Sequence, residues 1–277
     1  MSDSVESWSG KDRGEENFPV GSVLISAKLR PHIHAFYAFA RNADDIADSA
    51  TLTPEDKIAR LDVMEAVLTG ARPSGSPSAA KLRESLAATG VSPDHAQDLL
   101  IAFRQDARKP RYATWDELYR YCRYSAMPVG RHVLALHGER RTETWEPSDA
   151  LCTALQVLNH LQDCQQDLAQ MDRCYLPEDL LAAHGVTVED VRAPATSPGL
   201  RRVLDALLDR CTALNDQATR LPHAVRNRRL RLETAVIAGL SQRLAARLRA
   251  GDPLATRVKL TKRDALGSLW GALRVLP

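Results

Sequence analysis

The sequence predicts an all-α protein, and three observations support this fold class. Apolar residues recur at helical spacing through most of the chain, as in the stretches from Leu200 to Leu221 and from Val225 to Ala250. Helix-start signals precede several of these stretches, and the clearest is the capping box Thr114-x-x-Glu117. Sustained apolar/polar alternation with hairpin turns, which would predict strands, is not found in the sequence.

The first half of the chain predicts helices separated by proline and glycine. A capping threonine, Thr53, is followed by proline and two acids, an arrangement typical of a helix N-terminus. Two prolines and two glycines between Gly70 and Ser78 predict a loop. The predicted helices run from Asn17 through Ala27, from Pro31 to about Asp48, from Thr53 through Leu68, from Ser92 to Lys109, and from Thr114 to Leu136.

The second half continues the same pattern. Gly138 ends one predicted helix, residues 193–199 form a loop, and Gly251-Asp252-Pro253 interrupts the chain before the last helix. The predicted helices run from Ser148 to about Met171, over a short stretch after Leu176, from Leu200 to Leu221, from Val225 to Ala250, and from Lys262 to Leu276.

Length and composition bound the domain organisation and the class of protein. The chain has 277 residues, 44% of them hydrophobic, which is enough for one large core. Residues 1–16 are rich in Ser, Asp, Glu, Gly and Lys and predict a disordered lead. Because the helical pattern is unbroken and without internal repeats, we expect residues 17–277 to form a single domain.

Charge and cysteine usage indicate the compartment. The formal net charge is +2, so the chain as a whole lacks the strong field of a nucleic-acid binder. Five scattered cysteines without a Cys-x-x-Cys pair predict free thiols in a reducing compartment. The N-terminus is polar and acidic, unlike a secretory signal, and apolar runs fall well short of the roughly 20 residues that a spanning helix needs. We therefore expect a cytoplasmic protein.

The stretch from Tyr37 to Asp48 carries the first candidate site. On a helical wheel one arc holds Tyr37, Arg41, Asp44, Asp45 and Asp48, and the opposite arc holds Phe36, Phe39, Ala43 and Ile46. Asp44 and Asp48 are about 6 Å apart along the helix axis, a reach over which two carboxylates can bind Mg²⁺. The alternative is a solvated face on which Arg41 pairs with Asp44 or Asp45.

A second acidic face lies more than a hundred residues further on. Asn159, Asp163 and Asp167 are spaced by four and share one helix face over about 12 Å. A solvated face usually mixes both charges, whereas the stretch from Cys152 to Asp172 contains neither lysine nor arginine. An amide and two carboxylates are oxygen donors of the kind that Mg²⁺ prefers. Two such faces on opposed helices would form a cage for a metal-bound diphosphate.

These motifs resemble those of the squalene and phytoene synthase family, over nearly everything from Asn17 to the last helix. The resemblance rests on the two aspartate motifs, on Tyr121-Cys-Arg-Tyr124, and on Arg173-Cys-Tyr175-Leu-Pro177. Phrases such as Asp44-Asp45-Ile46-Ala47-Asp48 and Asn159-His160-Leu161-Gln162-Asp163 are most similar to the bacterial hopanoid-pathway hydroxysqualene synthases. The chain departs from many relatives at Ala47 and Gln166, where they carry glutamate, and this leaves the number of bound metals open.

The resemblance implies a fold and a reaction. It implies an isoprenoid synthase-type helical bundle around a central cavity, and Mg²⁺-dependent ionisation of presqualene diphosphate, rearrangement of the cation and capture by water to give hydroxysqualene. The alternative within the family is head-to-head condensation of two farnesyl diphosphates to presqualene diphosphate, squalene or a phytoene-type product. The expected metal ligands are Asp44, Asp45, Asp48, Asn159, Asp163 and Asp167, of which Asp44, Asp48, Asp163 and Asp167 also count as catalytic.

Arginines and tyrosines complete the expected site. Arg41 and Arg173 suit bidentate bonds to phosphate oxygens, although Arg173 also suits a helix C-terminus. By resemblance Tyr124 lies beside the reacting carbons, and Tyr37, Tyr175 and Tyr121 are the further aromatic candidates. Core packing is the alternative for Tyr37, Tyr121 and Tyr124. A nicotinamide cofactor is not expected, because the sequence lacks a Gly-x-Gly-x-x-Gly fingerprint after a strand.

The C-terminal third raises the question of partners. Arginine runs between Arg220 and Arg263 lie beside a hydrophobic last helix that carries Leu266, Leu269, Trp270 and Leu273. They fit either a merely solvated basic face or a peripheral contact with anionic lipid at the inner face of the membrane. Other readings are a non-catalytic scaffold, against which the intact aspartates argue, and a nucleic-acid binder, against which the net charge argues. The resemblance also allows association with other hopanoid-pathway enzymes.

Overall fold

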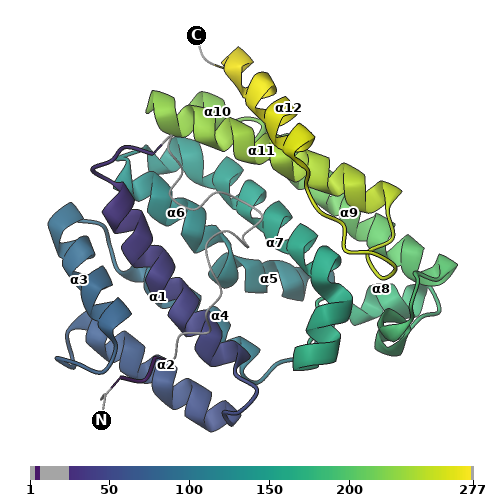
Figure 1. The fold of residues 1–277 in the computed structure, drawn as a ribbon, viewed down its shortest axis with the longest axis horizontal. Helices are drawn as coiled ribbons and strands as arrows, with labels where there is room; N and C mark the ends of the chain where they lie inside the picture. Colours follow the sequence, from purple (N-terminus) through teal and green to yellow (C-terminus); the bar gives the residue numbers. More distant parts are fainter. Residues whose placement is uncertain (1–3, 7–24, 276–277) are drawn as a thin grey trace. The chain divides into compact units, whose positions relative to one another are not determined.

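The computed structural model describes residues 4–6 and 25–275, and throughout these ranges the regular structure is helical (Figure 1). The predicted all-α class is confirmed, with no strand in either range. The described chain divides into two compact units. Unit 1 comprises Met1–Arg108 and Pro128–Glu139, and unit 2 comprises Lys109–Met127 and Arg140–Pro277. Whether residues 17–277 act as one domain stays a prediction.

Unit 1 is built around the predicted acidic helix. Its helices are α1 (Arg30–Asp48), α2 (Pro54–Thr69), α3 (Pro77–Thr89), α4 (Asp94–Asp106) and, apart from its first residue, α6 (Met127–Leu136). Helix α1 packs against α2, α3 and α4 through Phe39 and Ile46, which are fully buried. Burying an aliphatic or aromatic side chain of this size contributes about 2 kcal/mol. The core therefore fixes which face of α1 points inward.

Helix α3 is an element that the sequence analysis missed. The loop predicted over residues 70–78 ends two residues early, because Ser76 caps a helix that begins at Pro77. The Ser76 hydroxyl accepts a hydrogen bond from the Ala79 N–H at 3.2 Å. The helix PSAAKLRESLAAT has few large apolar residues, so its periodicity is weak even though Leu82 is completely buried.

Three residues of the predicted disordered lead belong to this unit. The Val5 N–H donates to the Gly75 carbonyl at 2.9 Å, and Arg60 donates to the Val5 carbonyl at 3.0 Å. The Glu6 carboxylate accepts from the Ser78 N–H at 3.0 Å, beside the positive end of the α3 dipole. Ser4–Glu6 are thus held against the segment before α3. The rest of the lead, and the predicted helix from Asn17 as far as Leu24, lie outside the described residues.

Unit 2 is organised along one long helix, α7 (Arg141–Met171), which packs against α9 and α11 (Figure 1). The last helix, α12, packs in turn against α11. The other elements of the unit are α5 (Trp115–Ser125), α8 (Glu178–Ala183), η2 (Val188–Arg192), α9 (Pro198–Ala218), α10 (Leu221–Ala224), α11 (Arg228–Ala250), α12 (Lys262–Ala272) and η3 (Leu273–Val275).

Most predicted helix ends differ from the structure by a few residues, and the two largest differences both lie near a proline. The helix expected from Thr114 to Leu136 is interrupted at Ala126, where φ is −123° and ψ is −50°, two residues before Pro128. A proline lacks the N–H that would continue the α5 ladder, so a new helix starts instead. Helix α7 begins at Arg141, earlier than predicted, and accommodates Pro147 in its second turn. Among the described helices, none combines the length and apolar character needed to cross a bilayer.

Candidate active site

The acidic face of α1 is partly shielded by the protein. As predicted, the opposite arc is buried, at Phe36, Phe39, Ala43 and Ile46. The side chains of the polar arc are intermediate in exposure, at Tyr37, Arg41, Asp44, Asp45 and Asp48. This arc is therefore neither core nor a freely solvated surface.

Arg41 is the cation of this face. Its Nη1 lies 3.0 Å from Oδ2 of Asp44, and its Nη2 lies 3.1 Å from Oδ1 of Asp45. The pairing expected in the solvated-face alternative is thus present, but the side chains are shielded. Arg41 is 14% exposed, Asp45 5% and Asp44 34%. One guanidinium holds two carboxylates and leaves the third acid of the arc, Asp48, outside these two ion pairs.

The electrostatics of this face favour an added positive charge. The pKa of Asp44 is raised to about 8, mainly by burial and also by the Asp48 and Asp45 carboxylates, while Arg41 lowers it. The environment therefore disfavours the ionised form despite the third of the side chain that remains exposed. A bound cation would remove this penalty by neutralising the charge that the three acids share.

The second motif forms a corresponding face in unit 2. Asn159, Asp163 and Asp167 are intermediate in exposure along α7. Burial raises the pKa of Asp163, and the neighbouring Asp167 adds to the rise. Nδ1 of His160 lies 4.0 Å from Oδ2 of Asp167. The second face thus also holds a carboxylate, Asp163, in an environment that disfavours its charge.

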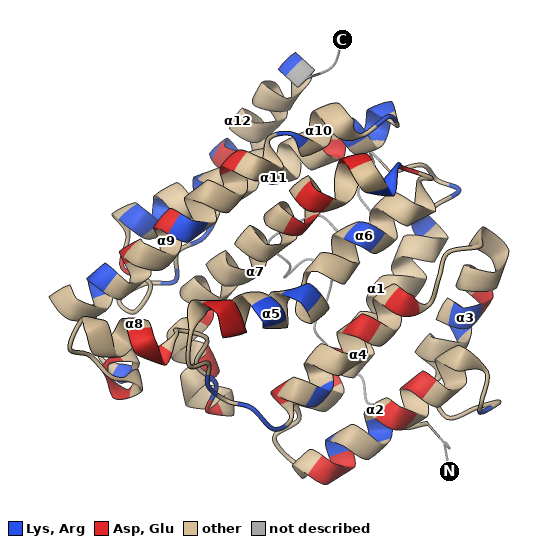
Figure 2. Cartoon of the chain, turned by 180° about the vertical axis from the view of Figure 1, so that it is seen from behind, with Lys and Arg blue, Asp and Glu red and all other residues tan. Residues whose placement is uncertain are grey.

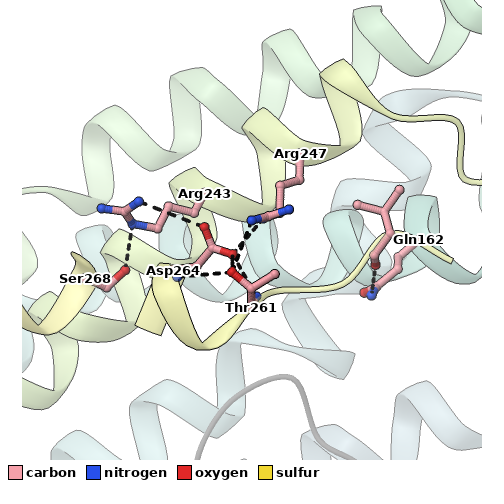
Figure 3. Close-up of polar contacts among 7 residues, drawn as sticks. Gln162, Arg243, Arg247, Thr261, Asp264 and Ser268 are labelled. Carbon is pink, nitrogen blue, oxygen red and sulfur yellow. Dashed lines mark hydrogen bonds and ion pairs between the residues drawn. The ribbon is translucent and has the colours of Figure 1, made fainter. Parts of the chain in front are cut away.

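Arg257, which the sequence analysis did not single out, supplies the positive charge here. Its Nη2 lies 3.1 Å from Oδ1 of Asp163. It belongs to the connecting segment 251–261 between α11 and α12, and the carbonyl of its neighbour Val258 accepts a hydrogen bond from Gln162 of α7 (Figure 3). The sequence shows Arg257 only as one of many arginines in the C-terminal third, so its role depended on tertiary structure.

Aromatic side chains cluster beside α7. The rings of His160 and Tyr175 stack with centroids 3.5 Å apart, and Tyr121 lies 5.6 Å from Tyr175. Tyr112, also missed in the sequence, lies 5.5 Å from Tyr175. Tyr121 is buried, in line with the core-packing alternative, whereas Tyr124 on α5 is half-buried; Tyr175 is also buried.

Arg173 follows the C-terminus of α7 and is buried. Its backbone N–H donates to the Asp167 carbonyl at 3.2 Å, and its guanidinium contacts Sδ of Met171 at 3.6 Å. Asp172, at φ 52°, makes the left-handed turn that ends the helix. The turn brings Arg173 back toward the last turn of α7, where the helix dipole favours a cation.

The donor set fits a metal that keeps part of its shell from water and substrate. In the part of the chain that the structure describes, no cluster of three or more His, Cys, Asp or Glu side chains is arranged to hold a metal by itself. Mg²⁺ typically takes one or two carboxylates together with waters and substrate phosphates. Carboxylate pairs such as Asp44 and Asp48, and the pair Asp163 and Asp167, suit this mode.

The predicted site residues fall into two groups. Unit 1 holds Tyr37 and the four charged residues of α1, and unit 2 holds the other candidates. Within each unit the structure brings the predicted residues of a motif onto one face. That the two acidic faces oppose one another stays a prediction.

Comparison with known proteins identifies the family. The profile described as squalene/phytoene synthase matches residues 11–264. The chain belongs to this family. Hydroxysqualene synthase of Rhodopseudomonas palustris is 45% identical over 99% of this chain and 93% of its own length. Hydroxysqualene synthase of Zymomonas mobilis is 44% identical over 94% and 87%, respectively.

Solved structures agree with the family. The crystal structure of squalene synthase HpnC from Alicyclobacillus acidocaldarius is 36% identical, with a TM-score of 0.75, and covers 86% of this chain and 90% of that chain. A dehydrosqualene synthase in complex with a ligand has a TM-score of 0.80 at 21% identity and covers 94% and 91%. The second likeness shows that the all-α fold is shared.

Proposed function

We propose that the protein is a hydroxysqualene synthase that converts presqualene diphosphate and water to hydroxysqualene and diphosphate. The observation that carries this proposal is the 44–45% identity to proteins of that name from three bacteria, over 91–99% of the chain. Such identity over nearly the whole length extends well beyond the aspartate motifs that the wider family shares. The reaction class is a carbon–oxygen bond cleavage that releases diphosphate.

The proposed work of the acidic faces is to hold the diphosphate through Mg²⁺. Asp44, Asp45 and Asp48 on one helix and Asn159, Asp163 and Asp167 on the other would be its ligands. Bound Mg²⁺ neutralises phosphate charge and so makes diphosphate a good leaving group. Both motifs are proposed to serve one diphosphate, and this rests on the sequence and the family rather than on the placement of the units.

Arginines would bind the departing diphosphate directly. Arg41 presents a planar guanidinium that can exchange a carboxylate for a phosphate oxygen. Arg257 is proposed to do the same at the second motif, because it lies on Asp163 and is half exposed. Arg173, buried at the end of α7, is proposed to reach the same group. Each would stabilise negative charge as the carbon–oxygen bond breaks.

Aromatic residues would stabilise the carbocation. Tyr124, Tyr37 and Tyr175 are proposed to face the reacting carbons, where the ring quadrupole favours positive charge. Tyr121 is proposed to position Tyr175, since the two rings are 5.6 Å apart. An apolar pocket delays water until the rearrangement is complete, and water then attacks the final cation and loses a proton.

A substrate comparison tests the proposal. The purified protein is given Mg²⁺ with either presqualene diphosphate or farnesyl diphosphate, and the products are identified by mass spectrometry. Hydroxysqualene and diphosphate from presqualene diphosphate are expected. Rapid consumption of farnesyl diphosphate with no reaction of presqualene diphosphate would contradict the assignment. The Asp163→Asn variant serves as the inactive control.

The second candidate function is head-to-head condensation of two farnesyl diphosphates. One observation favours it, namely the 36% identity to a solved protein described as a squalene synthase. Phytoene synthase of Pantoea ananas, at 30% identity over 70% of the chain, is more distant. In the same assay, presqualene diphosphate, squalene or a phytoene-type product from farnesyl diphosphate would identify this activity.

Location and pathway partners complete the proposal. All five cysteines carry free thiols, which fits a reducing cytoplasm. Both the substrate and the product carry long hydrocarbon chains. We therefore propose that the enzyme works at the inner face of the membrane, beside the enzymes that make its substrate and consume its product. Co-purification with such enzymes from the native host would test the association.

A further inference from the structure

Helix α12 has its polarity reversed relative to a helix packed on a core. Its buried positions are Asp264, Ser268 and Ala272, which recur every four residues. Its exposed positions form an apolar stripe, the α12 stripe, in which Leu266 is 66% exposed, Leu269 40%, Trp270 70% and Leu273 47%. The apolar residues, which in most helices of a soluble protein are buried in the core, therefore face outward in α12.

Polar contacts with α11 fix this orientation. The Asp264 carboxylate accepts a hydrogen bond from Arg247 at 2.7 Å, and the Ser268 hydroxyl accepts one from Arg243 at 3.1 Å (Figure 3). The Asp264 carboxylate also accepts from the Thr261 N–H at 2.7 Å and completes the capping box that starts the helix. Rotating α12 to hide the stripe would break both hydrogen bonds to α11.

The two helices also approach closely on this side. A Cβ built on Gly239 of α11 would lie 3.1 Å from Oγ of Ser268. A Cβ on Gly267 would lie only 2.5 Å from a guanidinium nitrogen of Arg243. The small residues at the contact let α12 seat firmly with its apolar face outward. The α12 stripe is thus a fixed feature of unit 2.

The charges around the stripe are all positive. Lys262 and Arg263 at the start of the helix and Arg274 after its end are exposed, and on a helical wheel they fall on the same arc as the stripe. The single acid of α12, Asp264, is on the buried side. Figure 2 draws α12 largely in the tan of uncharged residues along its length. An apolar stripe bordered by basic residues is typical of helices that lie in a lipid interface.

We propose that the α12 stripe docks onto the surface of an anionic lipid bilayer, with the helix lying in the plane of the interface. Trp270 and the leucines would enter the boundary between headgroups and acyl chains, while the three basic residues meet lipid phosphates. Charge favours lipid over a second copy of the chain, because a symmetric copy would bring like charges together. Helix α12 has 11 residues and is too short to cross the membrane. The inference is independent of the catalytic proposal, since α12 and the aspartate motifs share no residue.

Vesicle flotation tests this docking. The full-length protein is mixed with phosphatidylcholine vesicles with or without phosphatidylglycerol. Binding is expected on the anionic vesicles, weakening by about fivefold for Lys262→Gln. The double variant Leu266→Ser with Trp270→Ser is expected to lose about 10-fold or more. The matched control is Ile101→Ser on α4, which removes another exposed aliphatic residue, 44% exposed, and is expected to bind normally.

Fluorescence gives a second readout that does not depend on a polar substitution. Nitroxide-labelled lipids in the anionic vesicles should quench the wild-type protein, and Trp270→Phe should bind equally well while losing most of that quenching. Equal quenching of the wild type and Trp270→Phe would overturn the proposal. Failure of the wild type to bind anionic vesicles would also overturn it. A double variant that still floats with the vesicles but has a lower molecular mass in solution would overturn it too, and would assign the stripe to a contact between copies of the chain.

Discussion

The acidic faces of α1 and α7 are paired with their arginines in different ways. On α1 the cation is Arg41, three and four residues from its partners on the same helix. On α7 the cation is Arg257, which reaches Asp163 from 94 residues away. Arg41 is 14% exposed and Arg257 48%. The carboxylates of the α1 face are thus paired with a shielded arginine of the same helix. The α7 face depends instead on an arginine in a connecting segment that is open to solvent.

This difference predicts how strongly the stability of each face depends on its arginine. A helix holds Arg41 beside Asp44 and Asp45 as long as α1 is folded. Arg257 keeps its place through the segment 251–261, which is tied to α7 by the hydrogen bond between Gln162 and Val258. We therefore expect α1 to tolerate loss of its arginine poorly and α7 to tolerate it well.

The largest expected effect tests whether both faces serve the reaction. Asp48→Asn on α1 and Asp167→Asn on α7 should each lower kcat/KM by on the order of 10²–10³-fold, because each removes a charged ligand of the metal-bound diphosphate. Steady-state kinetics with presqualene diphosphate measures this. The control is Asp209→Asn, an Asp whose side chain is 72% exposed on α9 and which should leave the activity unchanged. If only one motif variant lost activity, the proposal of a shared diphosphate would be wrong.

The next largest effect is on stability, and it compares a shielded arginine with an exposed one. Arg41→Gln should lower the free energy of unfolding by about 2 kcal/mol, because it leaves shielded carboxylates without their partner. Arg249→Gln is the matched control, since Arg249 also lies between two carboxylates, Asp205 and Asp209, but is 44% exposed. Its expected loss is about 0.5 kcal/mol or less. Urea unfolding of both variants measures these losses. Equal losses of unfolding free energy would contradict the predicted difference between a shielded and an exposed arginine.

A smaller effect should appear in the pH dependence of stability. Because the pKa of Asp44 is raised to about 8, the folded protein binds the proton more tightly than the unfolded chain does. Ionised Asp44 therefore destabilises the fold increasingly as pH rises from about 4 to about 8. In the presence of a chelator, Asp44→Asn should be more stable than wild type above pH 8, by on the order of 1 kcal/mol after solvent screening. Below about pH 4 the two proteins should unfold alike.

Thermal unfolding over this pH range measures the difference. Added Mg²⁺ with inorganic diphosphate should stabilise the wild type more than Asp44→Asn, since the cation relieves the same penalty. A constant difference between the two proteins at all pH values would show that Asp44 acts through packing rather than through its charge.

The smallest effect belongs to the second face. Arg257→Gln should change the free energy of unfolding by about 0.5 kcal/mol or less, as for other exposed ion pairs. It should also raise the pKa of Asp163 further, because Arg257 is what opposes the rise caused by burial. Carboxyl NMR titration can follow Asp163, and a stability loss as large as that of Arg41→Gln would contradict the contrast drawn between the faces.

The residues on each face could be predicted because helical periodicity is a local property. The spacing of Phe39, Ala43 and Ile46 alone predicts the apolar arc of α1, and all three residues are buried. Local signals also had limits. Helix α3 was missed because alanines and serines blur its period, and the break at Ala126 was missed although Pro128 follows it.

The sequence alone determined the helical class, the two acidic faces with their oxygen donors, and Arg41 as a partner of its own helix, since three and four residues along a helix always meet. Only the tertiary structure decided that Arg257 pairs with Asp163, that Tyr112, Tyr121 and Tyr175 form one cluster, and that α12 turns its leucines outward. The physical reason is the range of the interactions. Helical periodicity operates within a few residues, whereas these contacts join residues that only the packing of the elements of unit 2 brings together.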